Sequence, residues 1–448
     1  MIRVHRFLIA TTVLGSLFMV SGMFTIAHGG DFTTESNDFD GPMLVPSQQP
    51  YLNQAKEAEA KPNETQNAPA TEKTTPKTTE QAAEKDAPPD DSASTPPAVE
   101  PKRELSPELA ALRDRVRRVL TAHHKPNYST RQNSATEIMS VCRAFGCGAE
   151  VSLNGQRLNG ITCLCWNYPC AGFEMLGLSG NHIAARIGYG HQERPGEFLA
   201  MLAMARVPSD YPVRVGEDTR TIADLVEAEK LGCRSGDDLS LKLISLMYYV
   251  NDEPQWKNDL GETWSIERII KEEIAKPVIT APVGGLNRLL GLSYVVDRRT
   301  KRKQPIDGQF LRAQKYTNDF HEFALRLQNS DGSWGPHFLA AKSTSSDIKS
   351  QLRSTGRVFE WLAMSLPEEK LDDAHAVNAV GCLVRLLGSQ RYQQNTPSLS
   401  TEEIVAAGHA LHALVVYDTR VFKPADVEEK PAAEKPSPVA ASRQKTNR

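Results

Sequence analysis

The spacing of apolar residues predicts that one long block of the chain is helical. The first helix follows Ser106-Pro107-Glu108, a cap, a first-turn proline and an acidic residue that favours a helix start. Its apolar positions recur at helical spacing and are Leu109, Leu112, Val116 and Leu120. A second helix is predicted from Asn133 or Ser134 to Phe145. Further helices are predicted near residues 171–187, 195–206, 222–231, 239–250, 265–275, 286–296, 310–327, 351–365, 374–387 and 401–417.

This pattern predicts an all-α domain over residues 106–422, the length of one large domain. About twelve helices would form six helical hairpins, enough to close a double ring, the α/α toroid. In such a ring the inner helices are apolar nearly all round and the outer ones are amphipathic. Residues 241–250 and 404–416 have the first character, and residues 265–275 have the second.

Residues 150–166 differ from the rest and predict a small β-hairpin insertion. Val151-Ser152-Leu153 and Ile161 to Trp166 have strand character. They flank Asn154-Gly155 and Asn159-Gly160, both of which favour tight turns.

The segment Gln328 to Trp334 predicts a rigid corner between two helices. Asn329, Ser330 and Asp331 can bond to their own backbone, Gly332 accepts a positive φ, and Trp334 supplies a large apolar face. Gln328, Asp331, Gly332 and Trp334 together resemble the QW motif of the terpenoid-cyclase and protein-prenyltransferase superfamily. A weaker copy lies at 259–264, with Gln255 upstream.

The resemblance implies a squalene-cyclase-like toroid in which the Gln caps a helix and packs on the Trp. It does not carry over a known reaction. The chain lacks the Asp-x-Asp-Asp motif of the cyclases, the Asp-x-Cys of the prenyltransferases and the Cys-Gly-Glu-Gln of the thioester toroids. We therefore infer no catalytic residue from the family.

The N-terminal residues 1–30 predict a signal-anchor or transmembrane segment. Arg3 and Arg6 precede an apolar run from Phe7 to Ala27, and acidic residues follow it, an arrangement that predicts export of the remainder. Because the run is long and no cleavage site stands out, we favour an uncleaved single-pass anchor over a cleaved signal peptide of a secreted or periplasmic protein.

Two segments lack apolar periodicity. Residues 31–105 are rich in Pro, Thr, Glu and Lys and predict a disordered tether, and residues 423–448 predict a disordered tail. The net charge of −3 gives no reason to expect a nucleic-acid partner.

Five of the seven cysteines cluster around the predicted hairpin. They are Cys142, Cys147, Cys163, Cys165 and Cys170. In an exported chain this clustering favours one or two disulfides. A structural zinc site and plain buried thiols are the alternatives, and the spacing does not match a common zinc knuckle.

His191 and Glu193 are the tentative catalytic residues, because they precede a helix opened by Pro195 and could line the centre of a toroid. His321 and His375 are candidate assistants. The alternative is an ordinary helix-entry loop. No cofactor-binding or metal-binding set is predicted.

Other polar residues on the predicted helices have structural interpretations. Arg357 and Glu360 are interpreted as part of a solvated helix face, and Asp372 and Asp373 as groups that favour a helix start. His409 and His412 share a helix face and could bind a metal, but without a third ligand they are interpreted as core or groove histidines.

Two functions remain open. The favoured one is an exported, membrane-tethered toroid that acts as a binding or scaffold module for an unidentified ligand or protein partner. The alternative is an enzyme that acts on a lipid, terpenoid or polysaccharide by acid–base chemistry.

Overall fold

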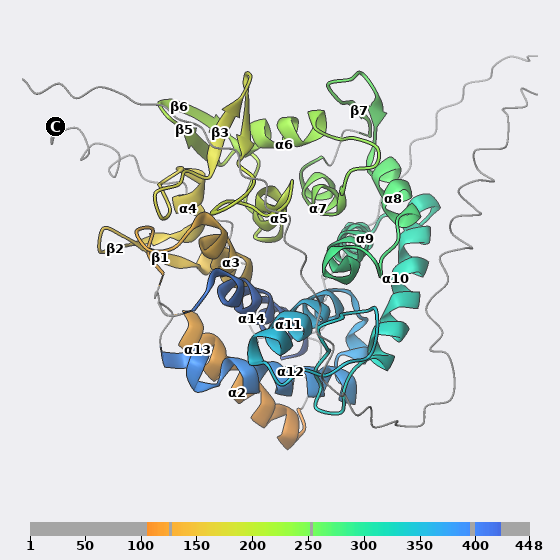
Figure 1. Ribbon diagram of the computed structural model, residues 1–448. Helices are drawn as coiled ribbons and strands as arrows, with labels where there is room; N and C mark the ends of the chain where they lie inside the picture. The colour runs from red at the N-terminus through yellow and green to blue at the C-terminus, as the bar shows by residue number, and fades with distance from the viewer. Residues whose placement is uncertain (1–104, 125–127, 251–253, 395–398, 423–448) are drawn as a thin grey trace, which may run out of the picture. The chain divides into compact units, whose positions relative to one another are not determined.

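Helices form most of the described part of the chain, which comprises residues 105–124, 128–250, 254–394 and 399–422 of a computed structural model (Figure 1). The α-helices are α2 (Pro107–His124), α3 (Ala135–Phe145), α4 (Gly160–Cys165), α5 (Glu197–Met204), α6 (Ile222–Leu231), α7 (Ser240–Tyr249), α8 (Ile266–Ala275), α9 (Leu286–Lys301), α10 (Gly308–Arg326), α11 (Ile348–Ser365), α12 (Ala374–Leu387), α13 (Gln390–Gln394) and α14 (Thr401–Val421). Short 3-10 turns are η1 (Gly146–Gly148), η2 (Pro282–Gly285) and η3 (Glu368–Lys370).

Eight short strands pair only with their immediate neighbours, as four antiparallel hairpins. They are β1 (Glu150–Leu153), β2 (Gln156–Asn159), β3 (Leu176–Ser179), β4 (His182–Ala185), β5 (Pro212–Val215), β6 (Asp218–Thr221), β7 (Trp256–Lys257) and β8 (Thr263–Trp264). The coarse prediction of a mostly helical chain with a small hairpin is confirmed, and three further hairpins are added.

Side-chain caps explain where several helices begin. The predicted cap at Ser106 is present, since its Oγ accepts a hydrogen bond from the N–H of Leu109 at 3.3 Å. Ser134 and Glu137 form a reciprocal capping box at α3, and Ser400 and Glu403 form another at α14. The Thr401 hydroxyl also donates to Glu137 Oε1 at 2.6 Å, which fastens the two helix starts together.

The prediction of a strand at 161–166 is wrong, because this segment is helix α4. The turn at Asn154-Gly155 is tight, so the partner strand β2 already pairs with β1 from Gln156 onward. Asn159 then ends the strand and caps α4, its Oδ1 accepting from the N–H groups of Ile161 at 2.9 Å and Thr162 at 3.1 Å.

The prediction of a helix at 171–187 is also wrong, because β3 and β4 occupy this segment. Leu178 pairs with Ile183 across a turn at Gly180-Asn181. The Asn167 side chain bonds the backbone of Leu176 in both directions, at 2.7 Å and 3.1 Å, and so holds β3 extended. Turn chemistry and this remote amide outweigh the helical spacing of the apolar residues.

Six helices contact one another in sequence. Along the chain α3 contacts α5, α5 contacts α7, α7 contacts α9, α9 contacts α11 and α11 contacts α14, and α14 contacts α3 in turn (Figure 1). The expected difference between helices is present: α7 is buried along most of its length, whereas α8 buries one stripe that includes Ile269, Ile270 and Ile274.

The corner at 328–334, predicted to lie between two helices, contacts three helices, α10, α11 and α12. Trp334 is buried, its Nε1–H donates to the carbonyl of Ala324 in α10 at 2.8 Å, and its backbone N–H donates to Thr355 Oγ1 in α11 at 3.1 Å. Gln328 Nε2 donates to the carbonyl of His375, in the first turn of α12, at 2.9 Å. Gly332 has a φ of +85°, and a Cβ there would lie 2.1 Å from the carbonyl oxygen of Asn378.

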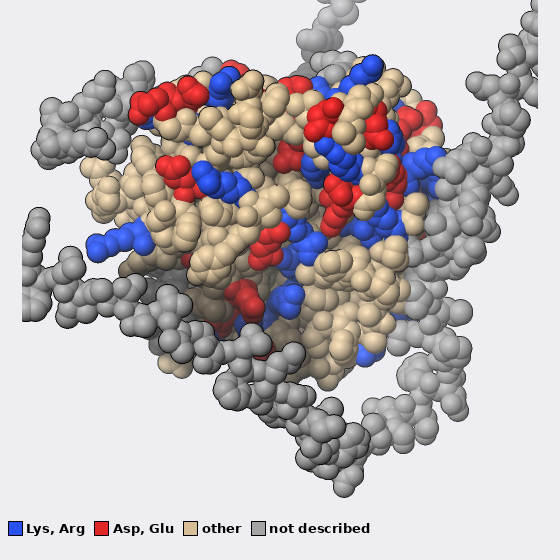
Figure 2. Space-filling model, turned by 45° about the horizontal axis from the view of Figure 1, so that its top comes forward, with Lys and Arg blue, Asp and Glu red and all other residues tan. Residues whose placement is uncertain are grey.

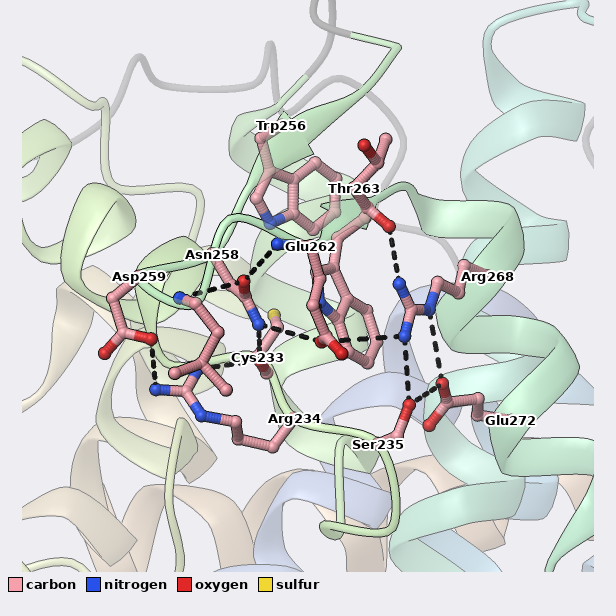
Figure 3. A network of polar contacts seen from close by, with 12 residues as sticks. Cys233, Arg234, Ser235, Trp256, Asn258, Asp259, Glu262, Thr263, Arg268 and Glu272 are labelled. Atoms are coloured by element: carbon pink, nitrogen blue, oxygen red, sulfur yellow. Dashed lines mark hydrogen bonds and ion pairs between the residues drawn. The ribbon is translucent and has the colours of Figure 1, made fainter.

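The weaker copy at 258–264 repeats the same backbone turn. The Asn258 N–H donates to the Glu262 carbonyl at 3.0 Å, as that of Asn329 does to Ser333 at 2.8 Å. Figure 3 shows that Asn258 and Glu262 lie within a polar network that includes Arg268 and Glu272. Gln255 is exposed, so the resemblance at this copy is one of backbone geometry.

The predicted anchor at 1–30 and the predicted tail at 423–448 lie outside the described residues, as does the predicted tether at 31–105 except for Leu105. Among the helices that the structure describes, none combines the length and the apolar character needed to cross a membrane.

Candidate functional site

A buried carboxylate on α11 is held between two imidazoles on α14. Glu360 Oε2 lies 2.6 Å from His409 Nδ1, and Glu360 Oε1 lies 2.6 Å from His412 Nδ1. Both histidines and the glutamate are buried, with relative exposures of 3% for His409 and Glu360 and 9% for His412. The i, i+3 spacing of the histidines on α14 places both rings toward the same residue of α11.

Arg143 of α3 links this carboxylate to α5. Its Nη1 lies 3.9 Å from Glu360 Oε1, and its Nη2 lies 3.2 Å from Glu197 Oε1. Glu197 is the first residue of α5, and its other oxygen accepts from the backbone N–H of Glu193 at 3.0 Å. Four helices that lie far apart in the sequence therefore supply one cluster of charged side chains, which we call the interior cluster: Arg143, Glu197, Arg357, Glu360, His409 and His412.

Arg357 is the unusual member of the interior cluster. It lies one turn before Glu360 on α11, is partly exposed, and its side chain forms no hydrogen bond or ion pair with any residue that the structure describes. Burial and the neighbouring charge of Arg143 lower the pKa of Arg357 to about 10, so the side chain stays cationic at pH 7. The fold thus holds a cation that solvent reaches and that no carboxylate of the described residues pairs directly.

The protonation states in the interior cluster follow from its geometry. Burial alone would raise the pKa of Glu360, but attraction to His409 and the hydrogen bonds from both histidines hold it well below its usual value. Burial and the charge of Arg357 lower the pKa of His409 to about 3. A neutral imidazole still donates through Nδ1–H, so an ionised Glu360 beside a neutral His409 is the state we assign at pH 7. The Nε2 lone pair of His409 then faces away from Glu360 as an acceptor.

The described contacts do not bring His191 and Glu193 together. His191 Nε2 lies 3.1 Å from the carbonyl of Glu174, and its ring contacts Phe173 edge to face with centroids 5.6 Å apart. Glu193 is exposed. Their part in catalysis stays a prediction, although Glu193 lies near enough to the interior cluster to favour the charged form of Arg357.

His321 and His375, the predicted assistants, occupy structural positions. His321 is buried, lies 2.7 Å from the hydroxyl of Ser365 and packs on the ring of Trp361. His375 Nδ1 lies 2.6 Å from Gln328 Oε1 at the corner.

The clustered cysteines lie close together, as their spacing suggested. All seven cysteines are free thiols in the structure, and Cys142, Cys163, Cys165 and Cys170 are buried. A hydrogen bond with Cys170, together with burial, raises the pKa of Cys163. The formation of one or two disulfides within this cluster stays a prediction.

No group of three or more His, Cys, Asp or Glu side chains within the described segments is arranged to hold a metal ion. The described surface includes a groove along α2 between Asp114 and Ala122 and another lined by residues that include Asp347, Lys349 and Arg391. Neither groove is lined by a member of the interior cluster. On the face shown in Figure 2, acidic and basic side chains lie intermingled and do not form a patch of one sign.

Comparison with known proteins gives no relative from which a function could be transferred: no family model, no curated protein and no solved structure matches the chain. We therefore base the proposed function on the residues of the interior cluster.

The interpretation of Arg357 and Glu360 as a solvated helix face is wrong, because Glu360 is buried and bonded by α14. The prediction that His409 and His412 are buried histidines is confirmed. The available signal was a charged pair on one amphipathic helix together with two histidines on another. Such polar side chains need partners once the two helices pack on each other.

Proposed function

We propose that the chain is an exported, membrane-tethered α/α toroid that binds an anionic ligand at the interior cluster. The sequence of contacts α3, α5, α7, α9, α11, α14 and back to α3 supports an inner ring of six helices. The corner at 328–334 supports the same architecture, because its hydrogen bonds connect the consecutive helices α10, α11 and α12.

The unpaired cation Arg357 carries this proposal. A protein without a ligand gains nothing from holding a guanidinium in a place where its charged form is disfavoured, because desolvation of an unpaired charge destabilises the fold. An anion that accepts from Arg357 would restore the lost interaction, and guanidinium suits carboxylate and phosphate groups in particular. The accepting Nε2 of His409 would suit a hydroxyl on the same ligand.

The pKa of His409 favours binding over acid–base catalysis. A general base works best when its pKa lies near the operating pH, and a value of about 3 makes His409 a weak base in the free protein. The enzyme hypothesis is supported by a different observation, the orientation of two imidazoles by one carboxylate, an arrangement that enzymes use to position a base. An anionic substrate that neutralises the charge of Arg357 would remove one of the two main causes that lower the pKa of His409. The pKa of His409 would then rise.

The test is calorimetric titration of the full chain, purified in detergent, with inorganic phosphate, citrate and glucuronate, and with glucose as a neutral control. We expect at least one anion to bind, and Arg357→Gln to abolish that binding. Arg353→Gln is the matched control, since Arg353 lies one turn earlier on α11 and is exposed. Equal binding by Arg357→Gln and the unchanged chain would contradict the proposal.

The enzyme alternative is tested by incubating the chain with acidic polysaccharides and lipids and detecting products by mass spectrometry. Turnover that is lost in His409→Gln, while anion binding is retained, would replace the binding module with an enzyme.

A further inference from the structure

Exposed apolar side chains gather on one short segment of the chain. Seven large hydrophobic residues are exposed in the described part of the structure, and four of them lie between residues 173 and 189. Their relative exposures are 42% for Phe173, 56% for Leu178, 57% for Ile187 and 90% for Tyr189. Single exposed apolar residues are common, but a group of this kind marks an interaction surface. We call Phe173, Ile187 and Tyr189, at the base of the β3–β4 hairpin, the apolar patch.

Hydrogen bonds to neighbouring backbone define the turn that carries Tyr189. Tyr189 lies between Gly188 and Gly190, whose φ values of +115° and +78° reverse the chain on both sides of it. The turn is closed by the Gly188 N–H, which donates to the Gln192 carbonyl at 3.0 Å. It is bound to α3 by the Ala135 N–H, which donates to the Gly190 carbonyl at 3.0 Å.

Within the patch the aromatic rings support each other. Phe173 contacts Tyr189 edge to face, with ring centroids 6.2 Å apart and planes at 86°. Several interactions therefore define the backbone turn that exposes Tyr189, so the exposure of this side chain is a consequence of the fold.

We infer the occupant of the apolar patch from the predicted N-terminal anchor. The predicted anchor ends near Ala27, and the described structure begins at Leu105. A random-coil chain of this length would have a root-mean-square span of about 50 Å, so the predicted tether would keep an anchored domain within reach of its own bilayer. At that effective concentration a weak contact suffices for docking. A tyrosine beside phenylalanine and isoleucine is the composition that favours the boundary between headgroups and acyl chains.

We propose that the apolar patch docks the domain onto the surface of the bilayer that anchors it, with its three side chains at the boundary between headgroups and acyl chains. This inference rests on the membrane-tethered part of the proposed function and is independent of the interior cluster. Docking fixes the domain in one orientation relative to the membrane.

The test places an environment-sensitive fluorophore on Tyr189→Cys in the full chain, reconstituted in phosphatidylcholine and phosphatidylglycerol vesicles. Glu217→Cys is the matched control, because Glu217 lies at the turn of the β5–β6 hairpin with a side chain that is 99% exposed. The chain without an introduced cysteine gives the background from Cys147, which is only partly buried.

We expect a blue shift at position 189 and about three-fold stronger quenching by spin-labelled lipid than at position 217. Replacing Phe173 and Ile187 by serine should remove this difference. If aqueous iodide quenches both positions equally in chains that float with the vesicles, the docking proposal is wrong and the predicted anchor is unaffected. Failure of the unlabelled chain to float with the vesicles would overturn the anchor and the docking proposal together, while leaving anion binding to be measured separately.

Discussion

Arg357 and Glu360 lie one turn apart on α11, and only the side chain of the glutamate has hydrogen-bond partners among the described residues. Both oxygens of Glu360 are bonded by histidines of α14, whereas the side chain of Arg357 forms no hydrogen bond and no ion pair within the described structure. The two histidines satisfy the hydrogen-bonding capacity of the Glu360 carboxylate. The Arg357 guanidinium beside it is therefore available to bind an anion. This separation of two opposite charges on one helix is the basis of the anion-binding proposal.

Replacement of Glu360 by glutamine should destabilise the protein strongly. The variant leaves Arg143 and Arg357 without their nearest shared negative charge in a buried site. We expect the free energy of unfolding to fall by about 3–5 kcal/mol, the usual result of removing one partner from a buried ion pair. Denaturant unfolding measures it. The exposed Glu369→Gln on η3 should change the value by less than about 0.5 kcal/mol. A similar small effect at both positions would contradict the assigned charge state.

Replacement of Arg357 by methionine should stabilise the protein while abolishing anion binding. The pKa of Arg357 is lowered to about 10, so the folded protein disfavours the cation relative to the unfolded chain. Removing the charge should raise the free energy of unfolding by on the order of 1 kcal/mol. Thermal unfolding of this variant beside Arg353→Met provides the comparison. A loss of stability in Arg357→Met would show that the arginine is a structural residue and not a ligand-binding one.

Gly332 should tolerate no side chain. An alanine Cβ there would lie 2.1 Å from the Asn378 carbonyl oxygen, at a φ of +85°. We expect Gly332→Ala to lower the free energy of unfolding by more than about 3 kcal/mol, because the corner must separate from α12. Gly236 has a comparable φ of +90° with no atom near the added Cβ, so Gly236→Ala should cost only about 1–2 kcal/mol. If both variants lose the same free energy of unfolding, backbone strain alone, and not the close approach to α12, determines the destabilisation.

His321 should make the protein less stable as the pH falls through the mildly acidic range. Burial lowers the pKa of His321 from 6.5 to about 4, so below pH 6.5 the unfolded chain binds a proton that the folded chain cannot. This difference lowers the free energy of unfolding between pH 6.5 and pH 4, by about 3 kcal/mol at most, and the effect is absent above pH 6.5. His321→Gln should reduce the slope in urea unfolding across this range, and the exposed His182→Gln should not. An unchanged slope in His321→Gln would refute the assigned pKa.

The sequence predicted the parts of the fold that depend on local chemistry. Ser106 and Ser134 marked helix starts correctly, and the corner from Gln328 to Trp334 was correct because its turn residues require that geometry. The errors at 161–166 and 171–187 have non-local or turn-based causes, since Asn159 caps a helix and Asn167 holds β3 from nine residues away.

The site was harder to predict than the fold. His191 and Glu193 are close in sequence, and the contacts of His191 turn its ring toward Glu174 and Phe173. Glu360 and His409 are 49 residues apart, and only the packing of α11 on α14 joins them. One sequence alone does not reveal such a pairing, because each residue taken separately has an ordinary structural interpretation.

The most direct test of the anion-binding proposal is a crystal structure of the full chain grown with selenate, with the anion located by its anomalous scattering. The proposal predicts a selenate within hydrogen-bond distance of the Arg357 guanidinium, on the side away from Glu360. An ordered Arg357 that is paired with a carboxylate of the protein, without selenate beside it, would contradict the proposal.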